Sequence, residues 1–281
     1  MSDHQQDPIA TDWCGLRWSL WIPLNSSAAE YRASVSPDPG FYKIRAVGDS
    51  RLAYIGQTGR NLRERTRALA RGVNRGLDHP PWNDPHTAAG AMWAFRHEDG
   101  YEFEVSVVTA MHESPARQCL EDFLLHQHRI HRGGSTLLNH GRLHPMWTRP
   151  SNRAKGQPMQ RLEEPVDYES LPVARGDEAL LSGGWLGLNW TDEEPLSGTP
   201  PPAQPGVYLI RRGGEVIYFG QSVDLANRLG THAGDPRFQG GSYRAHVMPG
   251  ARPHHLLERE TDIIGAFFEL EGVPPAWQYR T

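Results

Sequence analysis

Short apolar runs occur in two pairs along the chain, and turn residues separate the members of each pair. The runs Gly40–Arg45 and Gly206–Arg211 each follow a Pro-Gly turn. A second run that ends in Tyr-x-Gly comes after Gly48-Asp49 in one half and after Gly213-Gly214 in the other. Strand-like runs separated by glycine-containing turns are typical of hairpins. The pattern therefore predicts one β-hairpin in each half of the chain.

Apolar residues at helical spacing follow each hairpin. Asn61 and Asp224 stand where an N-cap is expected, because a short polar side chain there can accept a hydrogen bond from a free backbone N–H. Another helix is expected to begin at Ser114-Pro115, with serine as the cap. Met92–Phe95 and Tyr101–Val108, on either side of an Asp-Gly turn, are expected to be further strands. The predicted fold class is α+β: two tandem small α/β sandwich modules, each with a short antiparallel sheet flanked by helices.

A set of motifs occurs twice in the same order, which indicates duplication of an ancestral module. We place the first module at residues 10–155 and the second, shorter one at 184–281, with an acidic, solvated linker at 156–183 between them. The extra length of the first module is expected in an irregular loop within 74–90. The matched segments are Trp13–Ser19 with Trp185–Thr191, Pro39–Arg45 with Pro205–Arg211, Tyr54–Thr58 with Tyr218–Ser222, Asn61–Arg65 with Asp224–Arg228, and Glu121 with Glu260, followed 18 residues later by Asn139 and Gln278.

The charge is unevenly distributed along the chain. Residues 1–160 carry 19 Lys and Arg against 16 Asp and Glu, whereas residues 161–195 carry 2 against 9. The net charge of -4 therefore arises in and around the linker, and nucleic acid remains possible as a partner.

Composition excludes several classes of protein. Hydrophobic residues make up 38% of the chain and charged residues 22%, which is typical of a soluble globular protein. Two cysteines, Cys14 and Cys119, are too few for a disulfide framework or a cysteine zinc cluster. No apolar run approaches the roughly 20 residues that span a bilayer, and the N-terminal residues do not resemble a signal peptide. We expect a cytoplasmic location and no membrane partner.

One arginine in each module is expected to face the core. Arg65 lies between Leu62 and Leu69 at helical spacing, and Arg228 has the same relation to Leu225. A partly buried arginine needs an anion, either a salt-bridge partner or a bound ligand. Other arginines form a basic stripe along the helix that carries the first of the two, at Arg60, Arg63, Arg67 and Arg71.

Two glutamates stand at corresponding positions of the repeat. The neighbours of Glu260 one turn away are apolar, so its carboxylate is expected to project from an apolar face, which is costly without compensation. Glu121 lies on a face that is half apolar, whereas Glu258 has polar neighbours and is expected to be solvated. A core carboxylate paired with arginine is one interpretation. Mg²⁺ (or Mn²⁺) is the favoured one, because such a cation binds one or two carboxylates together with waters and substrate phosphate.

In this order the motifs resemble those of the GIY-YIG nucleases. The GIY motif corresponds to Gly40-Phe41-Tyr42 and Gly206-Val207-Tyr208, and the YIG motif to Tyr54-Ile55-Gly56 and Tyr218-Phe219-Gly220. The motifs are short, and their ordered occurrence in both modules is what makes them specific. The chain therefore resembles a tandem pair of GIY-YIG nuclease domains.

The resemblance implies a phosphodiesterase that acts on DNA with a divalent metal. By this resemblance, Glu121 and Glu260 would hold the metal, Arg65 and Arg228 would stabilise the scissile phosphate, and Tyr42 and Tyr208 would activate water. Tyr54 and Tyr218 would orient the activating tyrosine, and Asn139 and Gln278 would brace the site.

Each module departs once from the family pattern. The family often has a histidine one turn after its arginine, where the second module has His232 and the first has Leu69. The family's asparagine is matched by Asn139, whereas the second module has Gln278. We favour the first module as catalytic; the second either cuts DNA or has become a scaffold that grips it.

The expected function is a divalent-metal-dependent endonuclease of the restriction or defence type, whose two modules act as an intrachain pseudo-dimer on DNA. Alternatives are a non-catalytic DNA-binding protein with degenerate modules, a structure-specific repair nuclease and an enzyme that cleaves RNA. Sequence recognition would fall to the inserted loop around Trp82–His86 and to the basic C-terminal end of the first module.

The remaining motifs favour structural interpretations. The repeated Trp-x-Gly-Leu-x-Trp motif is expected to pack in the core rather than stack on bases. The cluster of His126, His128 and His131 is interpreted as a basic helix face rather than a zinc site. A further basic set is interpreted either as a phosphate-contacting patch or as a solvated tail; it comprises Arg129, Arg132, Arg142, Arg149, Arg153 and Lys155, with Trp147 among them.

Overall fold

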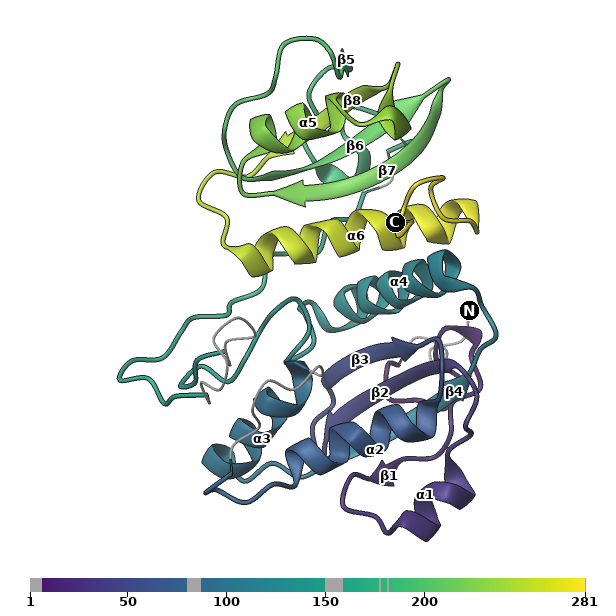
Figure 1. Ribbon diagram of the computed structural model, residues 1–281, viewed down its shortest axis with the longest axis vertical. Helices are drawn as coiled ribbons and strands as arrows, with labels where there is room; N and C mark the ends of the chain where they lie inside the picture. Colours follow the sequence, from purple (N-terminus) through teal and green to yellow (C-terminus); the bar gives the residue numbers. More distant parts are fainter. Residues whose placement is uncertain (1–6, 80–86, 150–158, 177, 181, 281) are drawn as a thin grey trace. The chain divides into compact units, whose positions relative to one another are not determined.

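The computed structural model describes residues 7–79, 87–149, 159–176, 178–180 and 182–280. Contacts divide the chain into two compact units. The first comprises Met1–Glu113 and Gln127–Glu169, and the second comprises Ser114–His126 and Ser170–Thr281. Helix α4, at Ser114–Arg132, therefore contributes its first part to the second unit and its last part to the first (Figure 1).

Each unit contains a four-stranded antiparallel sheet. In the first unit the strand order is β1-β4-β2-β3, and in the second it is β5-β8-β6-β7. The predicted α+β class with two sheet modules is confirmed. The bounds of the strands are Ile22–Pro23 for β1, Gly40–Ala46 for β2, Leu52–Thr58 for β3, Phe103–Thr109 for β4, Glu194–Pro195 for β5, Gly206–Arg212 for β6, Glu215–Ser222 for β7 and Ser242–Val247 for β8.

The two hairpins have the same register. Tyr42 pairs with Gly56 across β2 and β3, and Tyr208 pairs with Gly220 across β6 and β7. Both hairpins also shift register at the same place, after Ile44 in the first and after Ile210 in the second. The repeat seen in the sequence therefore extends to individual strand pairs.

Helices follow the hairpins as the sequence predicts. The side chains of Asn61 and Asp224 accept hydrogen bonds from backbone N–H groups in the first turns of α2 and α5, which confirms both N-caps. The helix expected at Ser114 begins there as α4. The bounds are Ala28–Ser34 for α1, Leu62–Val73 for α2, Thr87–Asp99 for α3, Leu225–Ala233 for α5 and Pro253–Glu271 for α6, with short 3-10 helices at Trp13–Gly15, Trp185–Gly187 and Pro236–Phe238.

Alternate residues of β6 serve two apolar cores in the second unit. Val207 and Leu209 belong to the core that includes α6, whereas Tyr208 and Ile210 belong to the core that includes α5. This is the period-two burial expected of a strand covered on both faces. The sheet therefore lies between α5 and α6 (Figure 1).

The prediction of a strand at Met92–Phe95 is wrong, because these residues lie inside helix α3. Ala88, Ala91, Met92 and Phe95, at helical spacing, all lie in the core of the first unit. The short apolar run was misinterpreted because periodicity over four residues does not distinguish a strand from a buried helix. The end of the expected irregular loop, at Thr87 to Gly90, is likewise helical.

The acidic stretch is more than a solvated linker. Met159 and Ala174 are buried, and the backbone N–H groups of Leu171 and Ala174 donate to carboxylates of α6. These acceptors are Glu258 and Asp262, and both are inaccessible to solvent. Most side chains of residues 160–176 are exposed, and a few buried residues and backbone donors attach the segment, Met159 to the first unit and Leu171 and Ala174 to the second.

The repeated tryptophan motif packs in the core, as predicted. Trp18 donates its indole N–H to the carbonyl of Trp13 at 3.1 Å, and Trp190 does the same to Trp185 at 3.1 Å. All four rings are buried. Among the described helices, none has the length and apolar character that crossing a membrane would require.

Candidate functional site

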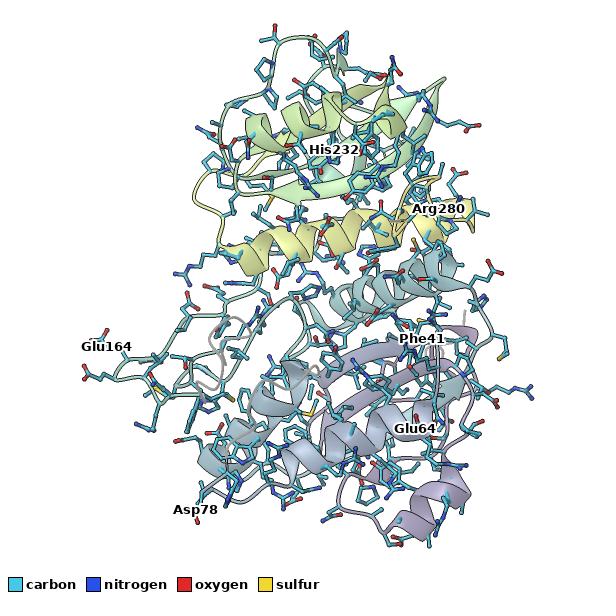
Figure 2. All side chains as sticks on the ribbon, viewed as in Figure 1. Phe41, Glu64, Asp78, Glu164, His232 and Arg280 are labelled. Atoms are coloured by element: carbon cyan, nitrogen blue, oxygen red, sulfur yellow. The ribbon has the colours of Figure 1, made fainter. Side chains whose placement is uncertain are left out.

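Five polar side chains of the second unit gather beside its sheet, around the hydroxyl group of Tyr208. Tyr208 comes from β6, Tyr218 from β7, Arg228 and His232 from α5, and Glu260 from α6. Figure 2 labels His232 at α5. The sequence grouped these residues from their order in the repeat, and the fold places them on elements that pack against the same strands.

The Tyr208 hydroxyl has two nitrogen partners. Arg228 donates from Nε to Oη at 3.2 Å, and Nε2 of His232 lies 2.8 Å from the same oxygen. Burial lowers the pKa of His232 to about 4, so the ring is neutral at pH 7 and can accept the tyrosine proton at Nε2. The ring of His232 also packs against Tyr218 and Phe238, with centroid distances of 5.3 and 4.5 Å.

Electrostatics keep the two tyrosines protonated. Burial raises the pKa of Tyr208 and of Tyr218, and the Arg228 guanidinium opposes this without reversing it. A phenol with a raised pKa is a weak base. Tyr208 can therefore take a proton from another group only if its own proton leaves at the same time, and His232 is placed to receive it.

Glycine at position 220 allows this packing of tyrosines. Gly220 pairs with Tyr208 across the hairpin, and a Cβ at this position would lie 2.6 Å from Cζ of Tyr208 and 2.8 Å from Cε1 of Tyr218. Gly56 stands in the same relation to Tyr42 and Tyr54, with corresponding distances of 2.5 and 2.7 Å. The Tyr-x-Gly spacing is therefore a steric requirement of two neighbouring phenol rings.

Glu260 joins the cluster from α6. Burial, followed by the negative charge of Asp122, raises the pKa of Glu260 to about 8, and the charge of Arg228 and a hydrogen bond from the backbone N–H of Gln221 oppose the rise. The carboxylate also acts on both tyrosines, because its charge helps to raise their pKa. Periodicity predicted a carboxylate on the apolar face of α6, and the side chain lies partly buried there.

Gln278 and Asn139 hold the central residue of each Tyr-x-Gly motif. The Gln278 side-chain carbonyl accepts from the backbone N–H of Phe219 at 2.9 Å. Asn139 makes the equivalent bond to Ile55 N–H at 2.9 Å and also donates to the Ile55 carbonyl at 2.8 Å. The longer glutamine thus replaces asparagine at the same backbone group, and both residues support the strand that carries the second tyrosine.

The first unit brings together Tyr42, Tyr54, Arg65 and Asn139. Arg65 donates from Nε to Oη of Tyr42 at 3.1 Å, close to the geometry of the second unit. The rings of Tyr42 and Tyr54 stack with a centroid distance of 6.0 Å, against 6.1 Å for the equivalent pair. Leu69, at the position of His232, is buried in the apolar core.

Glu121, the sequence-predicted metal ligand of the first module, lies on the part of α4 that belongs to the second unit. Its side chain is half-buried. The cluster described within the first unit therefore consists of two tyrosines, an arginine and an asparagine, whereas the second unit contains its own glutamate.

The donor set of the second cluster is compatible with Mg²⁺. Within the described residues, no group of three or more His, Cys, Asp or Glu side chains is arranged to hold a metal. Mg²⁺ does not require such a group, because it keeps several waters and binds one or two carboxylates plus phosphate oxygens. Glu260 is partly buried and feels the charge of Arg228, and a single such carboxylate is compatible with that mode of binding.

Glu258 was expected to be solvated, and this is wrong. Its side chain is fully buried and accepts from Leu171 N–H at 2.9 Å. His254, Thr261 and Asp262, on the same polar face of α6, are also buried. Helical periodicity missed this because the face is covered by hydrogen-bonding partners rather than by an apolar surface.

The histidine cluster does not form an exposed basic face. His126 and His128 are buried, and His128 accepts from Leu52 N–H at 3.2 Å. Burial lowers the pKa of His128 to about 3, which keeps it neutral. His131 is half-buried.

The proposed phosphate-contacting patch is divided by burial. Arg129 donates to the Ser135 hydroxyl and Arg142 to the Tyr168 carbonyl, and both side chains are buried, so neither is available to a phosphate. Arg132 pairs with Asp7, and Arg149 donates to the Gly141 carbonyl. Arg153, Lys155 and the loop at Trp82–His86 lie outside the described residues.

Sequence reasoning missed a buried carboxyl group near Glu260. Asp122 accepts hydrogen bonds from the hydroxyls of Tyr279 and Thr261, and burial raises its pKa to about 7. The sequence indicates burial of Asp122, since Cys119 and Leu125 flank it at helical spacing. The repeat, however, matches the neighbouring residue Glu121 and not Asp122.

A buried lysine in the first unit was also missed. Lys43 donates to the carbonyls of Pro8 at 2.9 Å and Ala10 at 2.6 Å, and its ammonium nitrogen lies 4.6 Å from the ring centroid of Trp18. Burial lowers its pKa to about 7. The signal was a single charged residue in the otherwise apolar run Phe41–Ile44.

Comparison of the chain with protein-family models, with curated proteins and with solved structures found no match.

Proposed function

We propose that the chain is a divalent-metal-dependent endonuclease that hydrolyses DNA phosphodiester bonds, of the type its motifs resemble. The observation that carries the proposal is the Arg228–Tyr208–His232 contact. It links a group that can bind an anion, a group that can receive a proton from water and a group that can take that proton further. Glu260 adds the carboxylate that metal-assisted phosphoryl chemistry needs.

Each side chain has a distinct task in this proposal. The Arg228 guanidinium binds the scissile phosphate and stabilises the charge that develops on its oxygens. Tyr208 receives a proton from the attacking water at Oη while its own hydroxyl proton passes to Nε2 of His232. The water oxygen forms a new bond to phosphorus, the ester P–O bond breaks, and the leaving alkoxide takes a proton from solvent.

Glu260 is the proposed ligand of Mg²⁺ or Mn²⁺. A divalent cation bound there would supply Lewis-acid stabilisation of the phosphoryl oxygens. The charge of Arg228 acts on Glu260, which supports a role for both side chains at the same phosphate. Tyr218 and Gln278 keep the neighbouring strand and the Tyr208 ring in place.

The first unit is proposed to act on the same chemistry with Tyr42 and Arg65. The Arg65–Tyr42 contact repeats the second unit's geometry, and Leu69 replaces the histidine. A pair of such sites in one chain is suited to cutting both strands of a duplex. We propose restriction of foreign DNA as the biological setting, for which an adjacent methyltransferase gene is the expected neighbourhood.

The proposal is tested with a 5′-labelled duplex oligonucleotide and the purified full chain, in Mg²⁺, in Mn²⁺ and with a chelator. We expect strand cleavage in either metal, no cleavage with the chelator, and strong loss of activity in Arg228→Ala combined with Arg65→Ala. Arg212→Ala combined with Arg17→Ala, at two exposed arginines, is the matched control. Intact DNA in every metal contradicts the proposal and leaves a binding function.

A further inference from the structure

A hollow of about 260 Å³ between α1 and α2 is lined mainly by arginines. It lies in the first unit, where the two helices pack together (Figure 1). Glu64, labelled in Figure 2, contributes the only carboxylate among its described lining residues. The full lining is Arg32, Asn61, Arg63, Glu64, Arg67 and Arg71.

The arginines are held as a group with few protein anions nearby. Arg63 is fixed by donating from Nε to the Val35 carbonyl at 2.8 Å and from Nη2 to the Arg32 carbonyl at 3.1 Å, which leaves other guanidinium N–H groups for a ligand. Within the part of the chain that the structure describes, Arg32, Arg67 and Arg71 make no ion pair. Four guanidinium groups against one carboxylate give the hollow a net positive charge.

A buried hydroxyl lies close to the same group. Tyr31 of α1 is 2% exposed, and its Oη has no hydrogen-bond partner among the described residues. The charge of Arg67 reaches this hydroxyl, because it acts to lower the pKa of Tyr31 against the effect of burial. Tyr31 packs in the apolar core of the first unit and does not line the hollow, so the groups that can bind a ligand there are the arginines.

The second module lacks this feature, although its fold is the same. Positions 226, 230 and 234 correspond to Arg63, Arg67 and Arg71, and they are occupied by alanine, glycine and glycine. The ten residues from Leu196 to Pro205 in the second module take the place of the stretch that includes α1. The arginines are therefore not required by the module's fold and belong to the first module alone.

We propose that this arginine hollow binds backbone phosphates of duplex DNA and holds the first unit on its substrate. The inference rests on the proposed function, since it identifies how a nuclease substrate is gripped. Arg65 faces the sheet from the opposite side of α2, so the hollow is separate from the Arg65–Tyr42 contact. Spaced guanidinium groups on a helix suit consecutive phosphates, which a single small anion cannot all occupy.

The test measures the salt dependence of DNA binding by the full chain without divalent metal, so that no cleavage occurs. The slope of log K against log salt is negative, and each lost phosphate contact reduces its magnitude by about 0.9. We expect Arg67→Gln combined with Arg71→Gln to reduce the magnitude of the slope by about 2. Arg17→Gln combined with Arg280→Gln makes an equal charge change at exposed positions and should leave the slope unchanged. Arg32→Gln with Arg71→Gln, both exposed, is a second pair whose folding is not at risk.

Other outcomes overturn the inference. An unchanged slope in both hollow variants, or no DNA binding by the wild-type chain, refutes it. A third outcome also refutes it: pyrophosphate at constant ionic strength stabilises the wild type but not the variant, while the salt dependence of DNA binding is the same in both. That outcome would identify a small polyphosphate as the ligand. A lowered slope in a chain that cleaves no DNA supports the hollow and contradicts the nuclease proposal, so the two failures are distinguishable.

Discussion

The hydroxyl oxygen of Tyr208 lies 2.8 Å from Nε2 of His232. The histidine is neutral because burial lowers its pKa to about 4. The phenol alone would be a poor base, and this contact gives its proton a destination. The equivalent position in the first unit is Leu69, so only the second repeat has a partner for the proton transfer that we propose.

His232→Leu reproduces the first module's residue in the second. We expect cleavage by the second site to slow by about 10²- to 10⁴-fold, the usual contribution of a positioned proton-transfer group. The measurement is the single-turnover rate in a Glu121→Ala background, which isolates the second site. His255→Leu, at a half-buried histidine of α6, is the control. An unchanged rate with His232→Leu would show that Tyr208 does not need this partner.

Gly220→Ala should destabilise the protein, because the added Cβ meets the rings of Tyr208 and Tyr218. We expect a loss of roughly 1–3 kcal/mol in the free energy of unfolding, measured by urea denaturation. Gly230→Ala in α5 is the matched control, since a Cβ there meets nothing within 4 Å. Helix propensity predicts that the control stabilises by about 0.5–1 kcal/mol. Equal effects at the two positions would argue against the packing described.

The raised pKa of Glu260 makes stability depend on pH. An acid whose pKa is 4.5 when unfolded and about 8 when folded binds more protons in the folded state, so its contribution to stability falls as pH rises between these values. Glu260→Gln should therefore be more stable than wild type at pH 9, by roughly 1–3 kcal/mol, and similar to it at pH 4. Glu271→Gln, exposed on the same helix, should follow the wild type at both pH values.

The lowered pKa of Lys43 makes stability depend on pH in the opposite direction. Its pKa is about 7 in the folded chain against 10.5 when unfolded, so the unfolded state binds more protons between these values and stability rises with pH. Lys43→Met should remove roughly 2–4 kcal/mol of that rise between pH 7 and pH 10. Arg17→Met, at an exposed site, should retain it. A wild-type stability with the same pH profile as Lys43→Met would show that the ammonium group is not buried as described.

The hairpins, both N-caps, the tryptophan packing and the partly buried position of Glu260 could be predicted from sequence. Each depends on local chemistry or on periodicity along a long element. The repeat then related Tyr208 to Tyr42 and Arg228 to Arg65, and the fold gives both pairs the same hydrogen bond. Comparing the two halves of one chain thus supplied information that neither half contained.

The errors arose where burial depends on segments far apart in the sequence. Polar neighbours on its own helix predicted that Glu258 is solvated, whereas the backbone N–H of Leu171 binds its buried carboxylate. Met92 was predicted to lie in a strand because a run of four apolar residues fits the period of a strand as well as that of a helix. Asp122 was missed because its partners, Thr261 and Tyr279, come from the other end of the chain.

The central claim is that each repeat contains a phosphodiester-cleaving site that depends on its glutamate. The most direct measurement follows supercoiled plasmid in Mg²⁺ with the wild type, Glu121→Ala, Glu260→Ala and the double variant. We predict linear product from the wild type, nicked circles from each single variant and no cleavage by the double variant. Cleavage by the double variant at the wild-type rate would contradict the claim.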